Sequence, residues 1–513
     1  MIDLSVRPSR RRAVTAHVVL GLLLQFVFVA QSLVILPLCI RSIGAGPYGF
    51  WLASGGILSW LAIANFGSAG LTMQRCASAY GRSDLAAARD WFMHGVVVAA
   101  ASAVVLLALL LPVAAFTPPW LGARGSVAAA LSSGMVIAGC GAALSPLNDT
   151  ARGFVCALQR NSFAMGAELA AATASLVFTI WALLAGWGIA GLAWGSLLRM
   201  ALALGLNAVF AAVCATQAAA STRWSRAIMA EYGKTLGPLW GASVVGQLVP
   251  QLPLVVLAKA LGPELGPAAS LAYTATTRPI ALAEMFTMHA ISSTSSAITH
   301  LVEDPHAAGT ASARVRAMSS AVYAAIAGGV ALYCLGDEGF VNLWVGHDAF
   351  IGQAFVLAAA VASVASIQLR WLMNLGTSLG MVASTAVFQA VEGVARATAM
   401  IVGVACLGPI GIPLTGVVVM VCGASFIERR LAEHRAFPTA GTGRWGWLLR
   451  AVVACGVASL AARYIPRAYW GSWAAGMTLG GLAAALAVLA GSSEIRGWIM
   501  GWSAQQIKRF RAV

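Results

Sequence analysis

The residues of this chain with the clearest potential for chemistry are a few charged and polar side chains inside long apolar stretches. In the stretch 378–405, Thr385, Gln389, Glu392 and Arg396 follow one another at intervals of four, three and four residues. In a helix, this spacing places all four on one face. Glu392 precedes Arg396 by one turn, the better orientation for an i,i+4 ion pair. This face is expected to turn away from lipid, either as a structural ion pair that joins helices or as a cavity wall that meets substrate.

A second apolar stretch, 267–299, carries Arg278 directly before Pro279, and Glu284 follows in the same stretch. Proline removes a backbone donor, so we expect a bend or break in the helix beside the arginine. A charge near the centre of a bilayer costs roughly 2.5–3.5 kcal/mol on insertion scales. Such residues are therefore expected to line a bundle interior or a hydrated cavity.

A third arginine, Arg199, lies near the middle of the stretch 189–217 with no acidic residue nearby in the sequence. It must pair across helices with Glu168 or Glu392, or it must face a hydrated cavity. The sequence leaves these alternatives open.

Together these arginines could form a cationic site between two halves of the molecule. Guanidinium groups bind phosphate oxygens in a bidentate fork, and a low-dielectric surrounding strengthens that attraction. Such a site would attract a phosphate-bearing anion and repel cationic drugs. The candidate binding residues are Arg199, Arg278, Arg396, Glu392, Gln389 and Glu284, and the candidate rim residues are Arg41, Lys259 and Arg75.

Nothing in the sequence predicts a catalytic centre, a metal site or a cofactor. The nine cysteines are never closer than 16 residues and show no ligand spacing, and no GxxxxGK[ST] phosphate loop occurs. The longest predicted outer loop, about 336–349, holds only Asp337, Glu338, His347 and Asp348 as candidate reactive groups. We therefore expect a protein that is not an enzyme.

The elements that must position these residues are apolar stretches long enough, or nearly so, to cross a bilayer as helices, which takes about 20 residues. With 60% hydrophobic and 10% charged residues, the chain cannot be an ordinary soluble protein. We predict an all-α polytopic membrane protein with about 14 transmembrane helices. They run approximately over 14–40, 48–74, 92–115, 126–147, 162–186, 189–217, 237–261, 267–299, 317–335, 350–374, 378–405, 410–427, 451–466 and 470–491.

The basic residues orient these helices. With the N-terminus in the cytoplasm, 24 of the 32 Lys and Arg residues fall on the cytoplasmic side, five fall outside and three lie within the stretches. This bias follows the positive-inside rule for an even number of spans, with both termini cytoplasmic. The net charge of +15 therefore reflects membrane topology and not nucleic-acid binding.

A weak internal repeat predicts the domain organisation. RSIG at 41–44 ends the first stretch and KALG at 259–262 ends the seventh, each followed by a second glycine, Gly49 or Gly266. Six helices separate the two copies, so both cross in the same direction, as in transporters built from parallel repeats. We predict an N-terminal lobe over 1–217, a cytoplasmic linker over 218–236, a C-terminal lobe over 237–427, and two further helices with a basic tail over 428–513, that is, two six-helix lobes plus two C-terminal helices.

Four segments of the first 160 residues form recognisable motifs: PLCIRSIG at 37–44, YGFW at 48–51, ANFGSAG at 64–70 running on to Arg75, and ALQR at 157–160. These segments resemble Wzx-type polysaccharide flippases of the multidrug/oligosaccharidyl-lipid/polysaccharide exporter superfamily. The family often carries aspartate where Asn65 stands, so the resemblance assigns no ion-coupling role to this position.

The resemblance implies a flippase that moves an undecaprenyl-pyrophosphate-linked oligosaccharide across the bacterial inner (plasma) membrane, for surface polysaccharides such as O-antigen, by alternating access. It implies the lipid-linked oligosaccharide and membrane lipid as partners, together with a polysaccharide polymerase and glycosyltransferases. The alternatives are a lipid II flippase or a cation-coupled multidrug exporter of the same superfamily. A membrane polysaccharide polymerase or ligase is a more distant alternative.

Overall fold

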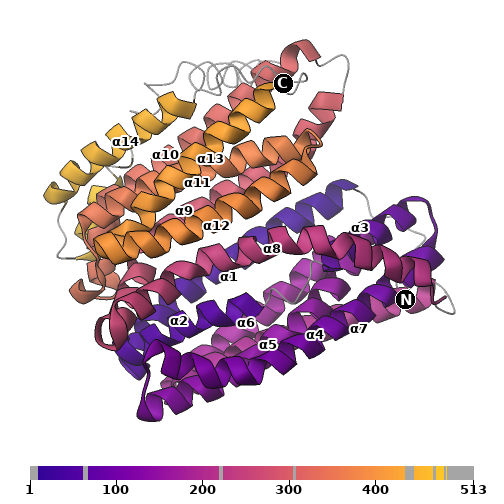
Figure 1. Cartoon of the computed structure of the whole chain (residues 1–513), viewed down its shortest axis with the longest axis horizontal. Coiled ribbons are helices and arrows are strands. Elements are labelled where there is room, and N and C mark those ends of the chain that lie inside the picture. The colour runs from indigo at the N-terminus through magenta and orange to yellow at the C-terminus, as the bar shows by residue number, and fades with distance from the viewer. Residues whose placement is uncertain are drawn as a thin grey trace, which may run out of the picture. The chain divides into compact units, whose positions relative to one another are not determined.

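The computed structural model describes residues 10–61, 68–218, 223–303, 308–433, 444–465, 469–478 and 481. Every regular element among these residues is helical, and no strand occurs in them (Figure 1). The α-helices are α1 (Arg10–Ile43), α2 (Ala45–Leu61), α3 (Ser68–Gly81), α4 (Leu85–Leu121), α5 (Gly125–Ala157), α6 (Asn161–Leu184), α7 (Ile189–Ala218), α8 (Arg226–Ala260), α9 (Gly262–Glu303), α10 (Ala308–Trp344), α11 (Gln353–Ser378), α12 (Val382–Leu407), α13 (Gly411–Glu433) and α14 (Arg444–Ala461).

These helices confirm the predicted all-α polytopic fold. Each apolar stretch from 14 to 466 coincides with one helix, except that 48–74 comprises α2 and α3. Within the described residues, nine helical segments are long and apolar enough to cross a membrane, one of which joins α12 and α13. Most of the fourteenth stretch, 470–491, lies outside the described residues, as does Asn65.

One predicted boundary is wrong. The outer loop expected at about 336–349 begins later, because α10 continues to Trp344. Val341 is buried on this last part of the helix, and the indole Nε1 of Trp473 donates to the carbonyl of Gly336 at 3.0 Å. These contacts stabilise the extension, and Asp337 and Glu338 are therefore helical.

The chain divides into two compact units, Met1–Leu271 and Ala272–Val513. Helix α8, which the sequence assigns to the second lobe, packs in the first unit against α2 and α4. The indole of Trp60 donates to the carbonyl of Leu248 at 3.3 Å, which ties α2 to α8. The predicted lobes were defined by the internal repeat and not by contacts between helices. Their boundaries therefore stay a prediction.

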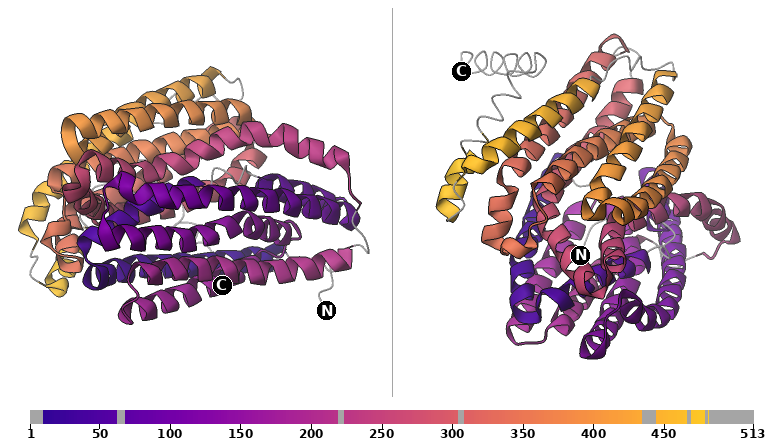
Figure 2. Two further views of the ribbon diagram at one scale, coloured as in Figure 1. Left: turned by 60° about the horizontal axis from the view of Figure 1, so that its bottom comes forward. Right: turned by 60° about the vertical axis from the view of Figure 1, so that its left-hand side comes forward.

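In the first unit, α5 packs against α7, α4, α3 and α2, and α6 packs against α7 and α1 (Figures 1 and 2). Three buried polar side chains join the inner helices. The amide of Asn207 on α7 donates to Asn148 on α5, whose own amide donates to Glu168 on α6, each at 3.0 Å. The carboxylate of Glu168 thus has a partner inside the helix bundle.

The two copies of the predicted repeat end their helices in the same way. Gly44 directly follows α1 with a φ of +92°, and Gly262, two residues after the last residue of α8 and the first residue of α9, has a φ of +76°. Both lie in the left-handed region, where glycine is favoured as a helix-terminating residue. The second glycines are close-packed: a Cβ on Gly49 would overlap the carbonyl of Pro267, and one on Gly266 would overlap the carbonyl of Ala258.

In the second unit, α11 packs against α10, α12, α13 and α14, and its side chains form much of the core. Trp371 on α11 is fully buried, and its indole Nε1 donates to the hydroxyl of Ser319 on α10 at 2.8 Å. The second unit therefore surrounds one largely buried helix.

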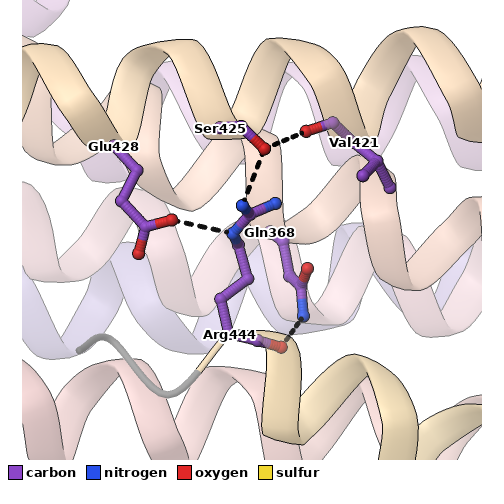
Figure 3. Close-up of polar contacts among 5 residues, drawn as sticks. All are labelled: Gln368, Val421, Ser425, Glu428 and Arg444. Carbon is purple, nitrogen blue, oxygen red and sulfur yellow. Dashed lines mark hydrogen bonds and ion pairs between the residues drawn. The ribbon is translucent and has the colours of Figure 1, made fainter.

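Arg444, whose side chain is only 1% exposed, attaches the first residues of α14 to this core. Figure 3 shows its polar contacts. Its Nε lies 3.1 Å from the Glu428 carboxylate on α13, and its Nη2 donates to the hydroxyl of Ser425 at 3.0 Å. Its backbone carbonyl accepts from the amide of Gln368 on α11 at 3.2 Å. The side chain and the backbone carbonyl of Arg444 thus join α14 to α13 and to α11.

We expect Arg444→Ala to destabilise the protein by about 3–5 kcal/mol, because removing one partner of a buried ion pair leaves the other uncompensated. Thermal unfolding of the protein in detergent would show a lowered midpoint. Arg463→Ala is the control, since Arg463 is exposed shortly after the same helix. Equal midpoints for the two variants would contradict this role of Arg444.

Candidate functional site

The predicted site residues fall into two groups, one in each unit. Arg41, Arg75, Arg199 and Lys259 belong to the first unit, and Arg278, Glu284, Gln389, Glu392 and Arg396 belong to the second.

The polar face of α12 turns into the second unit. Glu392 is buried, Gln389 and Arg396 are half-buried, and Val387, Val391 and Val394 on other positions of the helix are exposed. The Nε of Arg396 lies 3.2 Å from the Oε1 of Glu392, so the predicted i,i+4 ion pair is confirmed. An Nη of Arg396 also lies 3.8 Å from the sulfur of Met420 on α13. The pair therefore joins α12 to its neighbour.

Glu284 on α9 interacts with the same part of the second unit as Arg396. Its carboxylate forms a hydrogen bond with the side chain of Ser363 on α11 and interacts electrostatically with Arg370 and Arg396. Glu284, Glu392, Arg370 and Arg396 form what we call the second-unit polar cluster, with two acids and two bases. Its formal charges balance, so this part of the site is less cationic than the sequence suggests.

Arg370 and Ser363 are the members of this environment that sequence reasoning missed. The sequence predicts for Arg370 no role beyond its place among the cytoplasmic basic residues, whereas the structure places it inside α11. Its Nε donates to the hydroxyl of Ser366, one turn earlier, at 3.4 Å. The i,i+4 spacing of Ser366 and Arg370 could have indicated that the two side chains share one face of a helix and contact each other.

Arg278 is half-buried on α9. Of the predicted bend or break beside it, the break is wrong, since α9 runs without interruption from Gly262 to Glu303. Neighbouring helices can stabilise a helix that contains proline in a membrane protein. A role of Arg278 in binding substrate stays a prediction.

Arg199 makes neither of the two ion pairs considered from the sequence. Its guanidinium carbon lies 4.8 Å from the centroid of the Phe28 ring on α1, in a cation–π arrangement. Glu168 accepts from Asn148, and Glu392 pairs with Arg396. Among the ion pairs formed by described residues, none includes Arg199, and its Nε is buried without a hydrogen-bond partner. This arginine is the best candidate of its unit for binding an anion.

The three predicted rim residues differ in how far they are neutralised. Arg75 forms an ion pair with Glu231, and its guanidinium carbon lies 5.6 Å from the centroid of the Trp91 ring. Lys259 donates from Nζ to the carbonyl of Trp120 at 2.8 Å and has no acidic partner among the described ion pairs. Arg41 is exposed in the last turn of α1. Their predicted position at the rim of a common cavity stays a prediction.

No protein-family model matches the sequence, and no curated protein is significantly similar to it. Solved structures do match. An inward-facing multidrug resistance MATE family transporter of the MOP superfamily matches with a TM-score of 0.57 and 18% identity, over 79% of this chain and 95% of that chain. An outward-facing transporter of the same kind matches with a TM-score of 0.58 and 16% identity, over 83% of this chain and 97% of that chain.

The lipid II flippase MurJ, in an inward closed conformation, matches with a TM-score of 0.65 and 10% identity, over 92% of this chain and 97% of that chain. At such identities the likeness shows the fold alone. The chain is therefore a multi-pass helical membrane protein with the fold of MATE transporters and of the lipid II flippase. These neighbours are transporters or flippases and not enzymes.

The Arg396–Glu392 pair can be tested as a structural element. We expect Arg396→Met to destabilise the protein by about 3–5 kcal/mol because Glu392 would remain buried without its partner. Adding Glu392→Gln should recover most of that loss, as measured by thermal unfolding of all three variants in detergent.

A matched control is Arg430→Met, which breaks an exposed pair with Glu433 that should contribute at most about 1 kcal/mol. If the double variant is no more stable than Arg396→Met, Arg396 and Glu392 do not act as a pair.

Proposed function

We propose that this protein is a flippase that moves an undecaprenyl-pyrophosphate-linked oligosaccharide across the bacterial plasma membrane, for the synthesis of a surface polysaccharide. Alternating access would carry the charged headgroup through a hydrated interior while the polyprenyl tail stays in lipid. The polymerase and glycosyltransferases of that pathway are the expected protein partners.

The observation that carries this proposal is Arg199, a guanidinium inside an apolar helix that is placed on an aromatic ring and not on a carboxylate. An arginine within the membrane is costly, so a functional role is the default hypothesis. A pyrophosphate supplies several negatively charged oxygens, which a guanidinium binds with two parallel hydrogen bonds. The segments that resemble Wzx-type flippases support the choice of an oligosaccharide-bearing lipid.

The energy for this movement would come from an ion gradient. No ATP-binding loop motif occurs in the sequence. One elementary charge that crosses a potential of 100 mV releases about 2.3 kcal/mol. A proton or sodium ion moving inward could therefore drive the lobes between their two states.

Two other functions have comparable support. The lipid II flippase MurJ matches 92% of this chain, and its name gives lipid II as its substrate. A cation-coupled multidrug exporter is supported by the MATE matches. The balanced second-unit polar cluster repels cations less than three uncompensated arginines would, which weakens our sequence-based argument against drug export. A polysaccharide polymerase or ligase has no supporting match.

A deletion strain and a reconstituted assay separate these functions. If the proposal is right, deletion should be viable and should remove surface polysaccharide, and the purified protein should flip a fluorescent polyprenyl-pyrophosphate oligosaccharide in liposomes. An essential gene whose loss blocks cell-wall synthesis would support the lipid II flippase. Drug sensitivity with intact polysaccharide would support the exporter.

Arg199 variants test the binding step within that assay. Arg199→Ala should slow flipping by about tenfold to a hundredfold, because a hydrogen bond to a charged group contributes about 1.5–3 kcal/mol. Arg199→Lys should recover part of the rate, since it keeps the charge but loses the fork. Arg124→Ala, at an exposed position in the same unit, should flip normally. A normal rate in Arg199→Ala would remove this residue from the site.

A further inference from the structure

Asp337 on α10 is a buried carboxyl group that the proposed binding site does not use. It is only 2% exposed, and neither of its carboxylate oxygens has a hydrogen-bond partner. It also takes part in none of the ion pairs formed by described residues. Buried polar groups are almost always satisfied, so an orphaned carboxyl group needs an explanation.

Among the described residues, none of the groups that interact electrostatically with the Asp337 carboxyl group is basic. On its own helix it interacts electrostatically with Glu338, Tyr333 and Cys334. None of these three groups brings a positive charge to the carboxyl group.

Of the described helices that pack against α10, both α11 and α14 present neutral groups there, and the short helix Ala462–Tyr464 carries Arg463, which is exposed. Gln353 on α11 donates from Nε2 to the carbonyl of Cys334 and to the hydroxyl of Ser459 on α14, both at 2.9 Å. Cys455 of α14 forms a side-chain hydrogen bond with Cys334. Where the chain continues beyond α10, His347 and Asp348 are both exposed.

An ionised carboxylate cannot remain in such a place without a large penalty. Removing an ion from water costs several kcal/mol, and a buried charge without a partner is strongly destabilising. A bound proton removes the charge and turns one carboxyl oxygen into a donor. A metal cation would need several oxygen ligands around it, whereas one oxygen is enough for a proton.

A series of titratable side chains leads from Asp337 to the second-unit polar cluster. Tyr333 lies one turn before Asp337, is buried, and has a hydroxyl without a hydrogen-bond partner. It interacts electrostatically with Asp337, with Tyr273 and with Glu284. Glu284 in turn interacts with Arg396. The protonation state of Asp337 can therefore influence the charge balance around Arg396.

We propose that Asp337 is a proton-binding site, and that its proton exchange is coupled to the transport cycle. The coupling, but not the proton binding, rests on the proposed function. Asp337 lies two turns before the end of α10, at the predicted outer end. When water reaches it there, the carboxyl O–H bond breaks, the proton passes to water, and the hydrated carboxylate remains. Protonation from water restores the buried neutral form.

Infrared spectroscopy of the full-length protein in liposomes tests the binding of the proton. At neutral pH, the wild type should show the C=O stretching band of a protonated carboxyl group, and Asp337→Asn should lose one such band. Asparagine is neutral and of the same size, so the variant should fold. Asp348→Asn, which changes an exposed carboxylate eleven positions along the chain, is the control and should keep the band. An unchanged band in Asp337→Asn would overturn the proposal.

Sodium supplies a second outcome. If addition of sodium chloride at constant pH abolishes the band in the wild type, and sodium raises the unfolding temperature of the wild type but not of Asp337→Asn, the site binds a metal cation and the proton proposal is wrong. No effect of sodium on either quantity is the expected result.

The coupling is measured with the fluorescent lipid-linked oligosaccharide in liposomes that carry an imposed pH gradient. The gradient should accelerate flipping by the wild type and by Asp348→Asn, and this acceleration should be lost in Asp337→Asn. Equal acceleration in Asp337→Asn would contradict the coupling. A wild type that flips no such lipid would contradict the proposed function, while the infrared result for Asp337 would still stand.

Discussion

A charged side chain within an apolar helix must be neutralised, hydrogen-bonded or placed against a polarisable group, because hydrocarbon offers it no water. Among the described residues, several interior charges have such a contact. Glu392 pairs with Arg396, Arg444 pairs with Glu428, Glu168 accepts from Asn148, and Arg199 lies over Phe28. Three of these contacts also join different helices, so the same interactions that make charges tolerable hold the helices of each unit in register. Asp337 stands apart because it has no such contact.

The two units use their interior charges differently. In the second unit, two arginines and two glutamates form the polar cluster, and their formal charges balance. Under the proposal for Asp337, binding or release of one proton changes the net charge near this cluster. In the first unit, Arg199 keeps a positive charge that no carboxylate contacts among the described ion pairs. Under the proposed function, the first unit would contribute more to headgroup binding and the second more to coupling. A fold shared with drug transporters and with a lipid flippase leaves this choice to the individual side chains.

The sequence alone determined the class of protein, because the length of an apolar stretch is a local property that decides whether a helix can cross a bilayer. It also predicted the Glu392–Arg396 pair, since both residues lie on one helix and their spacing sets their distance. The internal repeat was also visible in the sequence, because Gly44 and Gly262 occupy matching positions in it. Both glycines have a positive φ in the structure.

Only the tertiary structure decided which helix supplies the partner of each remaining charge. Arg199 meets Phe28 instead of an acid, Arg444 pairs with Glu428 on another helix, and Asp337 lies within a helix instead of a loop. These outcomes depend on packing between segments that are far apart in the chain, and no spacing along one helix encodes them. The physical reason is that burial and pairing are properties of neighbours in space, whereas periodicity reports only neighbours on the same helix.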